Sequence, residues 1–135
     1  MKLDEIDIFA RTVWGEARGE EELGKIAVAW VVKNRAADPK WWGHDVIGVC
    51  LKPYQFSCWL KSDPNRKKLL AVTEDDPVFA DCKKICAAVL AGEIPDPTGG
   101  ATSYYADTMV NPPRWAKQMY TLCKIGRHVF LREFI

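Results

Sequence analysis

The chain has 135 residues, of which 48% are hydrophobic and 27% charged, and its formal net charge is +1. This length and composition are typical of one globular domain with its own hydrophobic core. The near-neutral charge argues against a nucleic-acid-binding protein, and the chain has no apolar run long enough for stable insertion in a membrane.

The chain begins with a charged segment, residues 1–5, that leads directly into a helical pattern. It has neither the apolar region nor the cleavage site of a signal peptide. We therefore expect synthesis in the cytoplasm without a signal peptide, and release by another route if the protein acts outside.

Apolar residues at helical spacing predict a first helix that starts at its N-cap Asp4 and ends near Arg18. Acidic residues 20–22 then precede a second helix, residues 23–36, which is apolar around most of its circumference. We expect this to be the buried central helix, ended by Asp38 and Pro39.

The remainder alternates irregular and regular segments. Residues 40–62 look irregular, with a short helical turn or strand at 46–50, and a short helix is expected through Leu69. Pro77 opens a further helix that Gly92 closes. Residues 101–105 look extended, a short helix should contain Trp115, and residues 122–130 look like a turn around Gly126 flanked by extended segments. This order predicts an α+β, mostly α, single domain over residues 1–135.

The five cysteines form an odd set in a chain without a signal peptide, which predicts reduced thiols. Cys82 and Cys86 share one helix face and should be core residues. A zinc site that also uses His44 or His128 is the alternative, but the spacings match no usual zinc pattern. We therefore expect no metal and no cofactor.

Glu16 lies in the stretch 13–20, where the first helix ends, between Gly15 and Gly19 and close to Trp14. A carboxyl group that lies near an apolar core and next to a break in the helix backbone has an environment typical of a general acid. The alternative is a surface residue in an i,i+4 pair or a cap.

The stretch 54–59 mixes aromatic residues with Gln55 and Ser57. Rings that stack on sugars and an amide that binds a hydroxyl or N-acetyl group would suit a sugar-binding groove. A packed loop with satisfied polar groups is the alternative.

Seven motifs in order resemble the cell wall hydrolase family that includes the catalytic domain of the spore cortex-lytic enzyme SleB. They are VWGEARGE at 13–20, IAVAWVVKNR at 26–35, QFS at 55–57, the helix end at 88–92, DPTGGATSYY at 96–105, PRW at 113–115 and IGRHVF at 125–130. A departure is Leu131, where an aromatic residue is expected.

The resemblance implies a lysozyme-like fold, related to lytic transglycosylases and resuscitation-promoting factors, that cleaves peptidoglycan glycan strands. Glu16 matches the catalytic glutamate, and Gln55 and Tyr104 or Tyr105 match groove positions. Further substrate-binding residues are expected at Ser57, Asn34 and His128. We expect no separate wall-binding domain and no export signal, which favours a phage or prophage endolysin. Such a protein is expected to be a monomer and to reach the periplasm through a holin.

A hydrolase that cleaves a glycosidic bond usually needs a second carboxylate, whereas a lytic transglycosylase needs one. No other acid has a setting like that of Glu16, which favours transglycosylation. An N-acetylmuramidase-type hydrolase is the alternative, and a zinc amidase or peptidase and a non-catalytic wall-binding module are more remote. The candidate second acids are Glu20, Asp45, Asp75, Asp76, Asp96 and Asp107, with Glu20 and Asp107 first.

Overall fold

The computed structural model describes residues 4–108 and 111–134, so the first three residues of the N-terminal segment considered above lie outside it. Within these ranges the chain is mostly helical, with one small sheet, as expected. The elements in chain order are α1 (Glu5–Ala17), α2 (Glu22–Ala37), α3 (Val46–Leu51), the 3-10 helix η1 (Ser57–Trp59), α4 (Pro64–Ala71), α5 (Pro77–Leu90), β1 (Ser103–Ala106), the 3-10 helix η2 (Arg114–Gln118), β2 (Met119–Ile125) and β3 (His128–Glu133).

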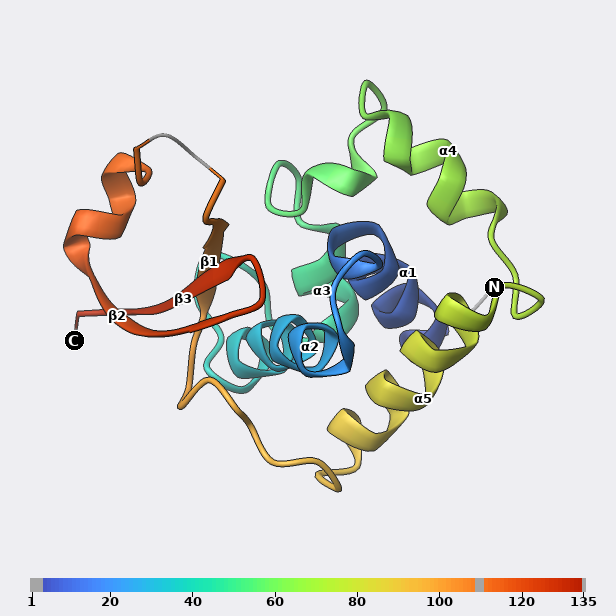
Figure 1. Cartoon of the computed structure of the whole chain (residues 1–135), viewed down its shortest axis with the longest axis horizontal. Coiled ribbons are helices and arrows are strands. Elements are labelled where there is room, and N and C mark those ends of the chain that lie inside the picture. The colour runs from blue at the N-terminus through green and yellow to red at the C-terminus, as the bar shows by residue number, and fades with distance from the viewer. Residues whose placement is uncertain (1–3, 109–110, 135) are drawn as a thin grey trace.

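Helices α1 and α2 lie in the middle of the molecule, with α4 and α5 on one side and the sheet on the other (Figure 1). Helix α2 packs against α1, α3 and α5, and its residues Ala27, Val28, Val31 and Val32 are fully buried. This confirms that α2 is the buried central helix. None of the helices in the described ranges has the length and apolarity needed to cross a membrane.

Helix boundaries follow the local chemistry of the sequence. The Asp4 side chain accepts a hydrogen bond from the Asp7 amide, and Asp76 accepts from Val78 and Phe79 at the start of α5. Gly92 follows α5 with φ of 73°, a left-handed conformation that glycine adopts without strain. These caps confirm the predicted starts and ends.

The sheet is antiparallel with strand order β1-β3-β2, so the last strand lies in the middle. Tyr104 of β1 faces Phe130 of β3 across the pair, and the β2–β3 register shifts between Thr121 and Cys123. Phe130 and Leu131 are fully buried. Leu131 therefore serves the core, where the resemblance led us to expect an aromatic residue.

The cysteines occupy the interior: Cys50, Cys58, Cys82 and Cys86 are buried, and Cys123 is partly so. This confirms that Cys82 and Cys86 are core residues. Burial raises the pKa of the Cys50 and Cys82 thiols to about 12, so both stay protonated at neutral pH. Within the described ranges no group of three or more histidine, cysteine or acidic residues is arranged to hold a metal ion.

Gly15 lets α1 approach η1 and α4 closely. A Cβ atom at this position would lie 2.9 Å from both Cβ and Sγ of Cys58 and 3.1 Å from Leu69 Cδ2. We expect Gly15→Ala to destabilise the protein by up to about 2 kcal/mol, because an overpacking cost of about 1–3 kcal/mol outweighs the gain of about 1 kcal/mol in helix propensity. Urea unfolding measures this. Gly19→Ala is the control, since a Cβ there meets nothing within 4 Å, and equal stability of the two variants would contradict the packing argument.

Candidate active site

Glu16 lies in the last turn of α1 and contacts the sheet. The Tyr104 hydroxyl of β1 donates a hydrogen bond of 2.6 Å to Glu16 Oε1. Burial, and then the negative charge of Glu16, raise the pKa of Tyr104 well above its ordinary value. The hydroxyl therefore keeps its proton at neutral pH and holds one carboxylate oxygen in place.

A second neighbour of Glu16 comes from η1. Cys58 is 1% exposed. Burial, and then the Glu16 charge, raise the pKa of its thiol well above its usual value. Trp14, which is close to Glu16 in the sequence, lies under the Arg18 guanidinium, 4.5 Å from the ring centroid, because residues four apart share one face of a helix.

His128 supports Tyr104 from β3, with the two ring centroids 4.7 Å apart. Burial lowers the pKa of His128 below its ordinary value, which keeps the imidazole neutral at pH 7. Its Nδ1 lies 3.6 Å from Glu20 Oε1, an oxygen that also accepts a 2.8 Å hydrogen bond from the Arg127 amide. His128 and Glu20 thus link the β2–β3 turn to Tyr104, the hydrogen-bond donor to Glu16.

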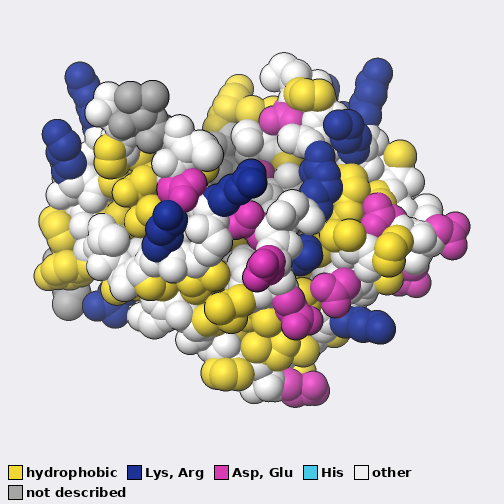
Figure 2. Space-filling view, viewed as in Figure 1, with side chains coloured by type: hydrophobic (Ala, Val, Ile, Leu, Met, Phe, Trp, Pro, Cys, Tyr) yellow, Lys and Arg dark blue, Asp and Glu magenta, His cyan; other side chains and the backbone are white. Residues whose placement is uncertain are grey.

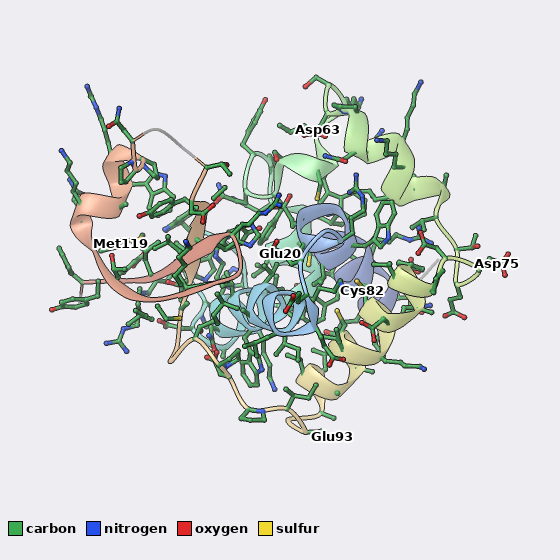
Figure 3. The ribbon with its side chains drawn as sticks, in the orientation of Figure 1. Glu20, Asp63, Asp75, Cys82, Glu93 and Met119 are labelled. Carbon is green, nitrogen blue, oxygen red and sulfur yellow. The ribbon has the colours of Figure 1, made fainter. Side chains whose placement is uncertain are left out.

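Gly126 is required in that turn. It has φ of 59°, and a Cβ atom on it would lie 2.5 Å from Glu20 Oε1. Only glycine combines this left-handed backbone with so close a carboxylate. In Figure 3, Glu20 lies near the middle of the molecule beside this turn, whereas Asp75 lies at the far edge.

Two hollows flank the Glu16–Tyr104 pair. The space-filling view is notched at its upper edge, between the sheet side and the α4 side (Figure 2). The acid hollow, of 210 Å³, is lined by Glu16, Ala17, Gly19, Glu20, Ala106, Thr108, Arg127 and His128. The aromatic hollow, of 370 Å³, is lined by Arg35, Trp41, Tyr54, Gln55, Ser103, Tyr104, Trp115 and Met119. Since Tyr104 lines one hollow and bonds to Glu16 in the other, the carboxylate lies between them.

Comparison with known proteins identifies the family. A family model described as Cell Wall Hydrolase matches residues 19–131, most of the chain. The chain belongs to the cell wall hydrolase family. The spore cortex-lytic enzyme of Halalkalibacterium halodurans is 31% identical over 128 residues, which cover 94% of this chain and 34% of that protein. The enzyme of the same name from Bacillus cereus is 30% identical over 96% of this chain and 44% of its own length. The chain thus spans less than half the length of these relatives.

Two solved structures of the cell wall hydrolase family resemble the fold. The catalytic domain of the Bacillus cereus SleB protein matches with a TM-score of 0.75 and 29% identity, over 95% of this chain and 89% of that domain. The catalytic domain of the germination-specific lytic transglycosylase SleB from Bacillus anthracis matches with a TM-score of 0.75 and 28% identity, over 98% and 97%. These matches confirm the lysozyme-like, mostly α fold. The matched family residues begin after Glu16, so its role rests on the geometry.

The predicted substrate-binding residues of this cell wall hydrolase lie in different places. Gln55 lines the aromatic hollow with Tyr104, and His128 lines the acid hollow. Tyr105, the next residue of β1, packs edge-on against Trp115 with ring centroids 6.2 Å apart. Ser57 is exposed at the start of η1 and lines neither hollow.

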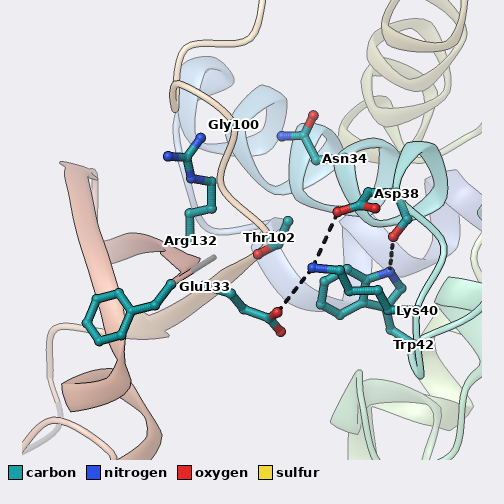
Figure 4. Close-up of a pocket in the computed structure, with 9 residues that line it drawn as sticks. Asn34, Asp38, Lys40, Trp42, Gly100, Thr102, Arg132 and Glu133 are labelled. Carbon is teal, nitrogen blue, oxygen red and sulfur yellow. Dashed lines mark hydrogen bonds and ion pairs between the residues drawn. The ribbon is translucent and has the colours of Figure 1, made fainter.

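Asn34 faces another hollow, of 380 Å³, where Lys40 bridges Asp38 and Glu133 (Figure 4). Its side-chain amide donates 2.9 Å hydrogen bonds to Asp96 Oδ2 and to the Ala101 carbonyl. These bonds brace the loop that leads into β1 and so position Tyr104.

The Asp96 carboxylate accepts hydrogen bonds from several groups of that loop. Although burial alone would raise its pKa, hydrogen bonds from Asn34, Thr98 and Gly100 lower it below the ordinary 3.8. A lowered carboxyl pKa contributes stability that is present above the ordinary pKa and lost as pH falls through the folded-state pKa.

We therefore expect Asp96→Asn to lower the free energy of unfolding at pH 7 by on the order of 1 kcal/mol, the usual net contribution of a hydrogen bond. The difference from wild type should shrink below pH 4, which urea unfolding at a series of pH values will show. Asp75→Asn, at an exposed acid, is the control. A difference that stays constant down to pH 2 would contradict the assignment.

The candidate second carboxylates are mostly engaged in structure. Asp45 and Asp76 cap helices, Asp96 holds its loop, and Asp107 pairs with Lys124 at 2.8 Å. Glu20 shares the acid hollow with Glu16, but one of its oxygens holds the β2–β3 turn. Glu16, by contrast, lines the acid hollow and accepts its hydrogen bond from Tyr104.

Among the residues that line the aromatic hollow, Arg35 and Trp41 were not predicted as site residues from the sequence. In the sequence, Arg35 is only a charged residue near the end of an apolar helix, and nothing there indicates a role in the site. Of the tandem pair Trp41-Trp42, the sequence does not show which ring is exposed. The structure buries Trp42 to 1% exposure and leaves Trp41 at 57%.

Proposed function

We propose that this chain cleaves the glycan strands of peptidoglycan as a lytic transglycosylase, with residues 1–135 acting as one catalytic domain. The observation that carries the proposal is the Glu16 carboxylate, oriented by Tyr104 between two hollows. Support comes from the solved SleB domain of Bacillus anthracis, itself described as a germination-specific lytic transglycosylase.

In the proposed reaction, protonated Glu16 donates its proton to the oxygen of the bond between N-acetylmuramic acid and N-acetylglucosamine as that bond breaks. The resulting carboxylate then takes the proton of the muramic acid 6-hydroxyl, whose oxygen bonds to the anomeric carbon. The product is a 1,6-anhydro sugar, and no water is consumed. Because the 6-hydroxyl belongs to the bound sugar, its attack has the entropic advantage of proximity.

Within this mechanism Tyr104 holds Oε1, which leaves Oε2 to exchange the proton with the substrate. Gln55 is proposed to bind the sugar in the aromatic hollow and His128 to border it in the acid hollow. Tyr105 is assigned to the groove wall because it packs against Trp115. Asn34 acts indirectly, by holding the loop before β1. Ser57 would reach substrate only along the rim.

The second candidate is an N-acetylmuramidase-type hydrolase. The observation that favours it is Glu20, whose carboxylate lines the same hollow as Glu16 and could activate a water molecule. The bond from the Arg127 amide to Glu20 weakens this candidate, because that oxygen is committed to the turn.

Digestion of purified peptidoglycan sacculi in oxygen-18 water separates the two. We expect muropeptides that end in 1,6-anhydro muramic acid, lighter than the hydrolysis product by one water and free of label. Ordinary reducing ends that carry one label would refute transglycosylation and direct mutagenesis to Glu20 and Asp107. Release of stem peptides, lost on chelation, would instead indicate a zinc amidase or peptidase.

A protein of this family acts on the cell wall, and its proposed partner is the peptidoglycan strand. The origin in a phage or prophage, release to the periplasm through a holin, lysis of the host and the monomeric state stay predictions. Expression with and without a holin, followed by culture lysis, tests the release route.

A further inference from the structure

Three exposed aromatic side chains meet at the aromatic hollow. They come from the loop after α2, the loop after α3, and η2, which are far apart in the sequence. Trp41 is 57% exposed, Tyr54 82% and Trp115 41%. Single exposed rings are ordinary on protein surfaces, but rings gathered around one hollow mark a binding site.

The backbone of Tyr54 is strained. Among the described residues it is the one non-glycine with a positive φ, at 66°. A bulky side chain rarely adopts this left-handed conformation, and such strain concentrates at ligand-binding sites. The ring it presents to solvent is not needed for the core, so folding alone does not explain a tyrosine here.

The floor of the hollow is polar. Arg35 is only 8% exposed, its Nε donates a 2.6 Å hydrogen bond to the Thr102 carbonyl, and its Nη1 has no hydrogen-bond partner in the described ranges. Its guanidinium lies between the rings of Phe56 and Trp42, at 5.3 and 5.6 Å. Within those ranges no carboxylate lies within ion-pair distance of Arg35, and Arg35 lines the aromatic hollow, so the hollow offers an oxygen-rich ligand a cation without an anionic partner.

The hollow continues on both sides. Tyr54 also lines a neighbouring hollow of 480 Å³, and Tyr104 joins the aromatic hollow to Glu16. The three hollows thus adjoin one another through Tyr54 and Tyr104, and the aromatic hollow has rings on its rim and donors on its floor, which suits an extended chain of pyranose units. The faces of these sugars are apolar, and their edges carry acyl and hydroxyl oxygens.

We propose that the aromatic hollow is the sugar subsite beside the catalytic carboxyl, where Trp41, Tyr54 and Trp115 stack on pyranose faces. Arg35 and Gln55 donate to an acyl oxygen of the sugar held there. This rests on the proposed function for the identity of the glycan. It adds Trp41, Tyr54 and Arg35 to the residues that contact substrate, and it assigns the strain at Tyr54 to substrate binding.

The test measures binding without turnover. In a Glu16→Gln background, peptide-free glycan strands from purified peptidoglycan are titrated by calorimetry. We expect Trp41→Ala, Tyr54→Gly and Trp115→Ala each to weaken binding about tenfold, the scale of a lost aromatic contact. Tyr54→Phe keeps the ring and should retain binding. Tyr120→Ala, an exposed tyrosine on β2 outside the hollow, is the matched control and should leave binding unchanged.

Thermal unfolding separates binding from folding. Glycine accepts a positive φ, so Tyr54→Gly should keep or raise the melting temperature while it weakens binding. A lowered melting temperature with unchanged binding would overturn the proposal and make Tyr54 structural. Unchanged binding in all three variants, or no binding by the Glu16→Gln background, would also overturn it.

The two proposals fail separately. If the wild type digests sacculi but the aromatic variants bind normally, the subsite is wrong and the activity stands. If the wild type digests nothing while the background protein binds and the aromatic variants do not, the activity is wrong and the subsite stands.

Discussion

Glu16→Gln is expected to reduce the release of muropeptides from purified sacculi by on the order of a hundredfold or more, the range lost with a general acid–base group. Glutamine has nearly the shape of glutamate but has no proton to give to a leaving oxygen. The amide oxygen can still accept the hydrogen bond from Tyr104, so the variant should fold with an unchanged melting temperature.

The matched control is Glu22→Gln, at an exposed acid in the first turn of α2. It makes the same chemical change away from both hollows and should leave turnover unchanged. A folded Glu16→Gln protein that clears peptidoglycan at the wild-type rate would refute the assignment of Glu16.

Local patterns predicted most of the helical fold. The start of α5 at Pro77 follows from an aspartate cap and a proline, and the burial of α2 follows from its apolar circumference, both readable from neighbouring residues. The β2–β3 hairpin was recognised only between residues 122 and 130, whereas the strands run from Met119 to Glu133. Strand length depends on pairing with a distant partner, and exposed Tyr120 and Thr121 give β2 no clear alternation.

The site depends on contacts that no local pattern encodes. Glu16 was predicted from its position at a helix end, but its hydrogen-bond partner lies 88 residues away on β1. Adjacent strand residues point to opposite faces, so only the register of β1 on β3 decides that Tyr104, and not Tyr105, reaches the carboxylate. The same holds for Arg35, whose role depends on a loop 67 residues further along.

Tyr104→Phe is expected to lower kcat by roughly ten- to a hundredfold, because hydrogen bonds to charged groups contribute about 1.5–3 kcal/mol and each 1.4 kcal/mol is a factor of ten. The phenyl ring keeps its contacts with His128 and Phe130, at 4.7 and 5.8 Å between centroids, so the fold should survive. What is lost is the donor that fixes Oε1 of Glu16.

The measurement that identifies this role is the separation of kcat from KM on soluble glycan strands. A residue that orients the acid acts mainly in the transition state, so kcat should fall while KM changes little. Tyr105→Phe removes a hydroxyl from the next residue of the same strand, which faces Trp115, and should leave kcat unchanged. Equal loss in both variants would indicate a general effect on β1. Full activity of Tyr104→Phe would show that proton transfer by Glu16 does not need the hydrogen bond from Tyr104.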